Sequence, residues 1–166
     1  MSEIVLDLRV EETTLTTNQL GMWSIGSVEI KKKKGYTGYA NRECLCITID
    51  FNLPSRKVTA LLDRLIECYG KPKRIRTDNG PEFTSKWFQL WLKQKGIAWS
   101  PIQKGSPQQN AIVERFNRTY REDVLDANLF ASLNHARELT AKWRWEYNHE
   151  REHQSLNYRT PIAYAA

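Results

Sequence analysis

The order of apolar and polar positions along the chain predicts strands first and helices later. Residues 44–51, CLCITIDF, are β-branched and apolar and predict a strand, and residues 23–30, WSIGSVEI, are weakly strand-like. Shorter strands are expected at residues 74–77 and 97–102. Strands that come first, then alternate with helices and give way to helices alone, indicate an α/β or α+β sandwich.

Helical periodicity predicts four helices, and capping residues mark the ends of the first two. The first is expected to follow Ser55 as its N-cap and to end at Gly70. The second is expected to be capped by Thr84 or Ser85 and to end at Gly96. The other two are expected over about residues 109–126 and 133–150.

Charge and composition narrow the class of protein. The formal net charge is +6, and a basic balance favours polyanionic partners such as nucleic acid or an anionic membrane. No apolar run approaches the roughly 18 residues that span a bilayer, and acidic residues interrupt the N-terminus where a signal peptide would be apolar. Three cysteines are an odd number, which indicates a reduced compartment. We therefore expect a cytoplasmic protein without a membrane partner.

The domain organisation follows from the same patterns. Residues 1–22 are polar and rich in Thr and predict a loose lead-in, whereas residues 23–166 predict one domain. Apolar residues make up 40% of the chain, which is enough for a single buried core.

Asp78 is the first candidate for a reactive group. It follows the short strand at residues 74–77 and begins the turn Asp78-Asn79-Gly80. Open α/β sheets place reactive groups at strand ends, because side chains there project into a crevice. Taken alone, however, an Asp in Asp-Asn-Gly is more often a plain turn residue.

Glu114 is the second candidate, near the start of the third predicted helix. It falls off the apolar stripe of that helix, which is formed by Val113, Phe116, Tyr120 and Val124. It shares its own face with Asn117, Arg118 and Arg121. This face is either a solvated surface with salt bridges, or it carries a metal-binding carboxylate beside arginines that bind phosphate.

Two longer strings distinguish between these readings. TDNGPEF at residues 77–83 and GSPQQNAIVERFNRTYRE at residues 105–122 resemble the insertion-sequence-three transposase family of the retroviral-integrase superfamily. The 35 residues between Asp78 and Glu114 match the last interval of the family's Asp, Asp, Glu triad. The resemblance covers residues 41–166 and includes EYNHEREHQSLNYRTP at its C-terminal end, with Trp23-Ser24 as an isolated match before it.

The resemblance implies a ribonuclease-H-like α/β fold, in which helices flank a central mixed sheet. It also implies a DNA transposase core that performs phosphoryl transfer with two Mg²⁺ or Mn²⁺ ions, for which Asp78 and Glu114 would be catalytic, metal-binding carboxylates. Its partners would be insertion-sequence ends, target DNA and further copies of the chain. The implied location is a cytoplasm of bacterial type, in association with the nucleoid. Residues expected to neutralise DNA phosphates are Lys104, Arg115, Arg118 and Arg121. Residues expected to touch DNA near the scissile phosphate are Gln108 and Asn110 of the polar loop.

The chain departs from the family at its first carboxylate. The family places an Asp in its opening strand, two residues after a Trp-Ser pair, and Gly26 stands at that position here. Losing one carboxylate near a cation removes about 4 kcal/mol at an effective dielectric constant near 20, which is roughly a thousandfold in rate. Glu29 is three positions on, and an odd step points it to the opposite face of a regular strand; Asp50 is an acid outside the triad. We therefore expect a degenerate first strand and impaired activity.

The mismatch covers the block Gly26 to Ala40 and ends abruptly at Asn41, which suggests translation out of frame or a deletion. A catalytically inactive, nucleic-acid-binding remnant of a transposase is the alternative function. The lead-in is too short for a helix-turn-helix, so recognition of DNA ends is expected from a separate partner or a missing upstream segment.

His149 and His153 fit the HExxH zinc pattern. Charged residues between them and the lack of a convincing third ligand argue against a zinc site.

Overall fold

A five-stranded mixed sheet forms the centre of the protein. The computed structural model describes residues 5–14, 21–30, 42–103 and 111–165; residues 5–14, 21–30 and 111–113 are described by their backbone alone. The strand order is β3-β2-β1-β4-β5; β1 pairs antiparallel with β2 and β2 antiparallel with β3, whereas β1–β4 and β4–β5 are parallel pairs. The strands are β1 (Val5–Thr14), β2 (Gly21–Ile30), β3 (Thr48–Asp50), β4 (Arg74–Thr77) and β5 (Ala98–Pro101).

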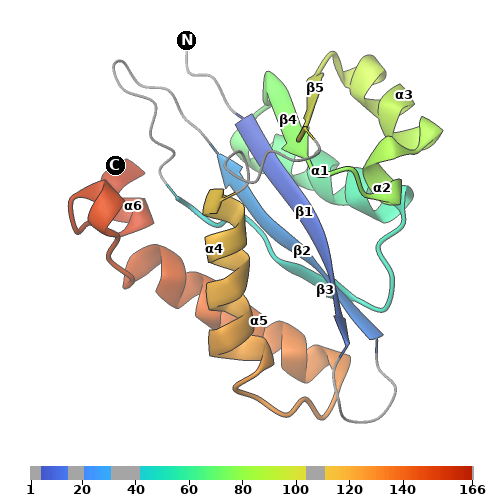
Figure 1. Cartoon of the computed structure of the whole chain (residues 1–166). Helices are drawn as coiled ribbons and strands as arrows, with labels where there is room; N and C mark the ends of the chain where they lie inside the picture. Colours follow the sequence, from blue (N-terminus) through green and yellow to red (C-terminus); the bar gives the residue numbers. More distant parts are fainter. Residues whose placement is uncertain (1–4, 15–20, 31–41, 104–110, 166) are drawn as a thin grey trace.

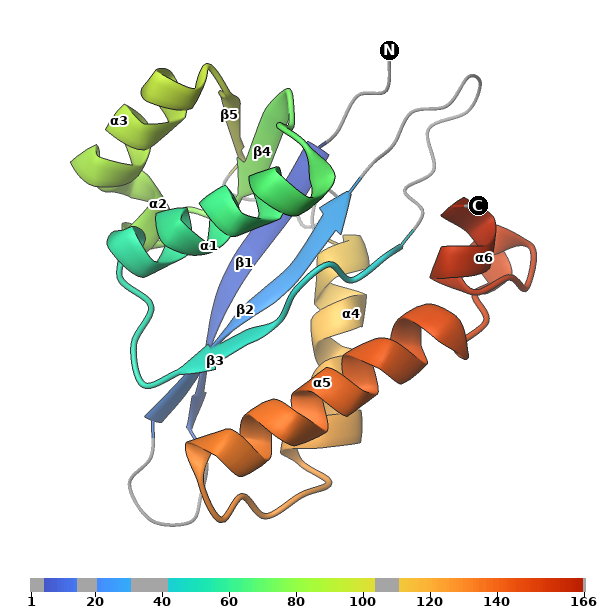
Figure 2. The same ribbon diagram turned by 180° about the vertical axis from the view of Figure 1, so that it is seen from behind.

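Helices cover both faces of this sheet. Figures 1 and 2 show α1 on one face and α4 on the other, with α5 running beside α4 and the edge strand β3. The helices are α1 (Ser55–Tyr69), α2 (Pro81–Thr84), α3 (Lys86–Lys95), α4 (Ala111–Tyr120), the π-helix η2 (Arg121–Leu125), α5 (Leu133–His149), the 3₁₀ turn η3 (Gln154–Leu156) and α6 (Pro161–Ala165). No helix within the described ranges is both long enough and apolar enough to cross a membrane.

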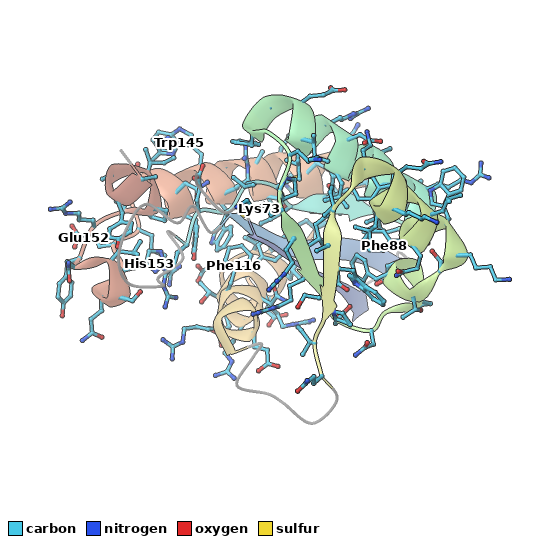
Figure 3. All side chains as sticks on the ribbon, turned by 90° about the horizontal axis from the view of Figure 1, so that it is seen from above. Lys73, Phe88, Phe116, Trp145, Glu152 and His153 are labelled. Carbon is cyan, nitrogen blue, oxygen red and sulfur yellow. The ribbon has the colours of Figure 1, made fainter. Side chains whose placement is uncertain are left out.

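In the described part of the chain, two larger hydrophobic cores lie against the sheet, beside a small cluster of Ile49 and Ala136. The first, here called the α1–α3 core, joins α1, α2, α3 and β4 through buried residues that include Val58, Ile75 and Phe88. The second, the α4–α5 core, is aromatic: the Trp143 ring lies 5.5 Å from that of Phe116 and 5.1 Å from that of Tyr147. Phe88 and Phe116 are labelled in Figure 3, well apart on α3 and α4.

Local chemistry accounts for the helix ends. Gly70 and Gly96 end α1 and α3 with positive φ angles of 89° and 63°, as expected from the sequence. Ser85 caps α3 by accepting the N–H of Phe88. The expectation that Ser55 caps α1 is wrong: Pro54 is the N-cap, and the Ser55 hydroxyl donates instead to the Glu82 carbonyl at 2.7 Å.

Strand β3 is shorter than the sequence predicts. Only residues 48–50 of the expected strand at 44–51 are paired in β3. Upstream, α5 binds the backbone: Asn148 binds both the N–H and the carbonyl of Cys44, and Arg144 donates to the Leu45 carbonyl at 2.7 Å. A hydrogen-bonded backbone does not need a strand partner, so the helix replaces part of the ladder.

The N-terminal strands also differ from the expectation. Residues 5–14, which the sequence pattern assigned to the loose lead-in, form β1 at the centre of the sheet. Gly26 was expected in the opening strand, but it lies in β2, where its register partner is Arg9 of β1. The alternation of Leu6, Leu8 and Val10 with Asp7 and Arg9 is typical of a strand, and the prediction of a lead-in from the polar, Thr-rich composition of residues 1–22 passes over it.

Candidate functional site

Asp78 lies between the end of β4 and the start of α2. Ile75 and Thr77 of β4 are fully buried, and Ile75 belongs to the α1–α3 core. Since side chains alternate along a strand, Arg76 faces the other side of the sheet. The same alternation, continued one residue past β4, assigns the half-buried Asp78 to that side as well.

Hydrogen bonds from β5 fix the backbone around Asp78. The Thr77 hydroxyl accepts the indole N–H of Trp99 at 3.0 Å and donates to the Asp78 carbonyl at 2.7 Å. Asn79 donates its side-chain amide to the Ile102 carbonyl at 2.8 Å. The Gly80 N–H reaches Oδ1 of Asp78 at 3.2 Å. The carboxylate is therefore held on a rigid strand end rather than on a free loop.

Glu82 is an acid beside this site that the sequence analysis did not single out. Its carboxylate lies directly over Gly80, where a Cβ would collide with it. Burial raises the pKa of the Glu82 carboxyl; the hydrogen bond from its own N–H opposes that rise, and the negative charge of Asp78 adds to it. The four-residue spacing in Asp78-Asn79-Gly80-Pro81-Glu82 was visible in the sequence, but the fold of the turn was needed to show that the two acids are neighbours.

Glu114 lies in the first turn of α4, the helix that covers the face opposite α1. It is half-buried, and Asn117 on the same side of the helix is only 5% exposed. This side of the helix is therefore only partly exposed, and the choice between a salt-bridging surface and a metal-binding carboxylate stays a prediction. Phe116, Tyr120 and Val124 are buried in the α4–α5 core, as the apolar stripe predicted.

The strand register bears on the missing first carboxylate. Asp7 of β1 is the register partner of Arg76 in β4 and of Glu29 in β2, so Asp7 lies in the strand next to the one that ends at Asp78. Gly26 lies one strand farther away. Among the residues that the structure describes, no three His, Cys, Asp or Glu lie close enough together to hold a metal ion.

The predicted DNA-contacting residues fall into two groups. Lys104, Gln108 and Asn110 lie outside the described residues. Arg115 and Arg118 are exposed on α4. Arg121 is half-buried at the start of η2.

The HExxH pattern does not form a zinc helix. Helix α5 ends at His149, whose ring stacks on Trp145 with centroids 4.7 Å apart. His153 lies beyond the helix and packs edge-on against Tyr147 at 5.1 Å. Two ligands on one helical face require an unbroken helix between them, so these histidines do not form that arrangement.

Family models match nearly the whole of this framework. One model described as an integrase core domain matches residues 21–107, and a second with the same description matches residues 95–161. The first match begins at β2 and includes Asp78, and the second includes Glu114.

Two proteins of insertion elements are similar in sequence. An uncharacterized 31.7 kDa protein of insertion element IS407 from Burkholderia multivorans is 41% identical over 75% of this chain and 45% of its own length. A transposase of insertion sequence element IS904 from Lactococcus lactis is 32% identical over 52% of this chain and 35% of its own length. This chain thus spans less than half the length of either relative.

Solved structures show the same fold at low sequence identity. The HTLV-2 integrase catalytic core domain, solved with magnesium in a dimeric form, has a TM-score of 0.62 and 18% identity, and the match covers 98% of this chain and 95% of that one. The simian T-cell lymphotropic virus intasome has a TM-score of 0.58 and 20% identity over 89% of this chain and 50% of that one. The expected ribonuclease-H-like fold is thereby confirmed. The chain belongs to the integrase core domain family, with insertion-element proteins among its relatives and retroviral integrase cores among its structural neighbours.

Proposed function

We propose that this chain is a transposase core for metal-dependent phosphoryl transfer on DNA, and that its activity is impaired. The observation that carries the proposal is the burial of Ile75 of β4 in the α1–α3 core. By alternation Asp78 then belongs to the other face of the sheet, and α4, the helix that contributes Glu114, covers that face. Acids from distant parts of the chain on one face of a sheet are the arrangement that two-metal phosphoryl transfer requires.

The residues present suit a hard divalent cation in kind. Asp78 and Glu114 offer carboxylate oxygens, which Mg²⁺ and Mn²⁺ prefer as ligands, and the HTLV-2 core was solved with magnesium. When bound, such ions would activate the attacking hydroxyl and stabilise the leaving oxygen. We assign Asp78 and Glu114 as the residues that would hold them.

The chain's own groups would position the substrate. The exposed guanidinium groups of Arg115 and Arg118 lie one and four residues after Glu114, so they would bind DNA phosphates next to the carboxylates. Lys104, Gln108, Asn110 and Arg121 are proposed for the same surface from their positions in the sequence. The hydrogen bonds that hold Asp78 through Thr77 and Gly80 would keep its carboxylate oriented without cost at the moment of reaction.

Two positions compete for the third carboxylate. The family match starts at residue 21, which favours position 26 as the family's Asp and leaves a glycine there. The register favours Asp7, because β1 lies directly beside β4. If position 26 is correct, the domain lacks a ligand; if Asp7 fills the role, the triad is complete.

A cleavage assay distinguishes these assignments. The substrate is a duplex carrying the ends of the element that encodes this chain, and the measurement is its nicking with and without Mg²⁺ or Mn²⁺. Asp78→Asn is expected to abolish nicking, whereas the matched exposed control Asp126→Asn leaves it unchanged. Gly26→Asp is expected to raise the rate up to roughly a thousandfold. If Asp7→Asn loses nicking and Gly26→Asp gains none, the third carboxylate is Asp7, and the proposal that the activity is impaired is wrong.

The second candidate function is a nucleic-acid-binding remnant without catalysis. Gly26, at a position where the family carries an Asp, is the observation that favours it. This candidate predicts that the chain binds DNA, that no metal supports nicking, and that Gly26→Asp does not restore it. In either case we propose assembly with further copies of the chain, since one structural neighbour is an intasome. We also propose a separate DNA-recognition segment, since the matches cover less than half of either relative's length.

A further inference from the structure

The positive charge of this chain is concentrated in one stretch of sequence. Residues 68–113 contain eight Lys or Arg but only two Asp or Glu, an excess that equals the formal net charge of the whole chain, +6. The residues before and after this stretch are therefore neutral in sum. The cations are Lys71, Lys73, Arg74, Arg76, Lys86, Lys93, Lys95 and Lys104, and the acids are Asp78 and Glu82.

The fold gathers Lys71, Lys73, Arg74 and Lys95 at one end of the sheet, and Lys93 lies in the same last turn of α3 as Lys95. Strand β4 begins where α3 ends: the Lys71 ammonium donates to the Lys95 carbonyl at 3.1 Å. Strand β5 begins at the same level, because the Ala98 N–H donates to the Lys73 carbonyl at 3.0 Å. Arg74 is the register partner of Ala98. Lys73 is labelled in Figure 3.

Most of these cations are exposed and have no carboxylate partner. Lys95 forms an ion pair with Asp63 at 2.7 Å. Within the part of the chain that the structure describes, no carboxylate lies within ion-pair distance of Lys73, Arg74 or Lys93, and all three are exposed. Unpaired like charges on fixed strand and helix ends repel one another, so an anionic partner would be stabilised there. We call Lys71, Lys73, Arg74 and Lys93 the sheet-end cationic surface.

We propose that the sheet-end cationic surface binds the phosphates of duplex DNA, as a second contact apart from the Asp78 site. Asp78 lies at the opposite end of β4, four residues from Arg74, which is about 13 Å along a strand. DNA held at both ends of β4 would pass along the β4–β5 side of the sheet. This inference rests on the proposed function, because DNA is the polyanion on which that function acts.

The test compares two double variants with equal charge changes in the full chain. Lys73→Gln/Arg74→Gln removes two cations from the surface, and Lys142→Gln/Arg159→Gln removes two exposed cations from the neutral C-terminal region. Binding of a labelled duplex of arbitrary sequence is measured over a range of salt concentrations. Each phosphate contact contributes about 0.9 to the slope of log K against log salt. We expect the first variant to reduce that slope by about 1.8 and the second to leave it unchanged, with circular dichroism showing that both are folded.

The outcomes separate the two proposals. If the unmodified chain binds DNA and Lys73→Gln/Arg74→Gln keeps the full slope, the sheet-end inference is wrong and the proposed function stands. If the unmodified chain does not bind duplex DNA at all, both the sheet-end inference and the proposed function are wrong. A control with polyglutamate tests whether the partner is DNA. If the chain binds polyglutamate as tightly as DNA, and Lys73→Gln/Arg74→Gln loses that binding, the surface binds anions in general and the assignment to DNA is wrong.

Discussion

At the scale of single residues, Asn148 makes the contact that links the C-terminal helix to a distant backbone. Its Oδ1 accepts the Cys44 N–H and its Nδ2 donates to the Cys44 carbonyl, both at 2.8 Å and across 104 residues of chain. Asn148→Ala would leave two buried backbone groups unpaired, at about 1–3 kcal/mol each. We expect the free energy of unfolding in urea to fall by about 2–4 kcal/mol. The exposed Asn134→Ala should change it by less than about 0.5 kcal/mol, and an equally small effect for Asn148→Ala would show that the backbone finds other partners.

His153 gives the protein a pH dependence whose sign follows from its surroundings. Burial, followed by the positive charges of Arg42 and Arg151, lowers the pKa of His153 from 6.5 to about 4. Its Nε2 is a buried atom without a hydrogen-bond partner among the described residues. The neutral ring is thus favoured in the folded state, whereas the unfolded chain takes up a proton near pH 6.5. Stability from this group is present above pH 6.5 and is lost as the pH falls towards 4.

The measurement is the free energy of unfolding between pH 7 and pH 4 for His153→Gln and for the exposed control His149→Gln. We expect the pH dependence to become shallower in His153→Gln and to keep its slope in the control. A slope that is the same in the unmodified protein and both variants would mean that other groups account for the acid sensitivity, such as Asp50, whose carboxyl pKa is lowered by the hydrogen bond from Lys57.

At the scale of elements, the sequence predicts what is decided locally and misses what is decided by distant partners. The ends of α1 and α3 could be predicted because Gly70 and Gly96 supply the required positive φ within a few residues. The extent of β3 could not, since α5 binds the backbone of Cys44 from the far end of the chain. Strand β1 is not predicted because the polar, Thr-rich composition of residues 1–22 outweighs the short alternation of Leu6, Leu8 and Val10. Its central place in the sheet depends on β4, which lies far along the sequence.

The same distinction holds for the candidate site. Asp78 and Glu114 were identified from motifs that resemble a known family, which record spacing along the chain but not geometry. The proximity of Glu82 to Asp78 depends on the turn at Gly80, and the position of Asp7 beside β4 depends on strand register. Neither a turn conformation nor a register is encoded in residue spacing alone.

Helix α3 offers a test of the local argument. The Gly96 N–H binds the carbonyls of Leu92 and Lys93 in a left-handed conformation, and the nearest atom to an added Cβ is the Lys71 ammonium at 3.7 Å. Space is therefore available, and only the backbone conformation opposes a side chain. We expect Gly96→Ala to lower the free energy of unfolding by about 1–2 kcal/mol. Gly96→Asn should lose less, because Asn adopts this conformation more readily, and equal losses for both would contradict the argument.

At the scale of the whole molecule, one sheet separates two cores that are built from different parts of the chain. The α1–α3 core comes mostly from residues 45–97, and the α4–α5 core mostly from residues 116–147. The segment just before β3 links them, because Cys44 belongs to the second core and Leu45 to the first. Neighbouring residues of one segment therefore face opposite cores, which should make the two unfold together.

Phe88→Ala and Phe116→Ala test this coupling from opposite sides. Each removes a buried ring and is expected to cost about 3–5 kcal/mol, a large part of the roughly 5–15 kcal/mol that stabilises a domain. Trp91 stacks on Phe88 with centroids 5.9 Å apart, and the Trp143 ring lies 5.5 Å from Phe116. Fluorine NMR of fluorotryptophan-labelled protein therefore reports each core separately during urea unfolding.

In each variant we expect the Trp91 and Trp143 signals to lose native intensity at one shared urea concentration, lower than in the unmodified chain. The control Leu129→Ala, at a residue that is 81% exposed, leaves the midpoint unchanged. If the Trp143 signal disappears first in Phe116→Ala while the Trp91 signal persists, the α4–α5 core unfolds on its own, and the carboxylate of Glu114 then lies on an element less stable than the strand that holds Asp78.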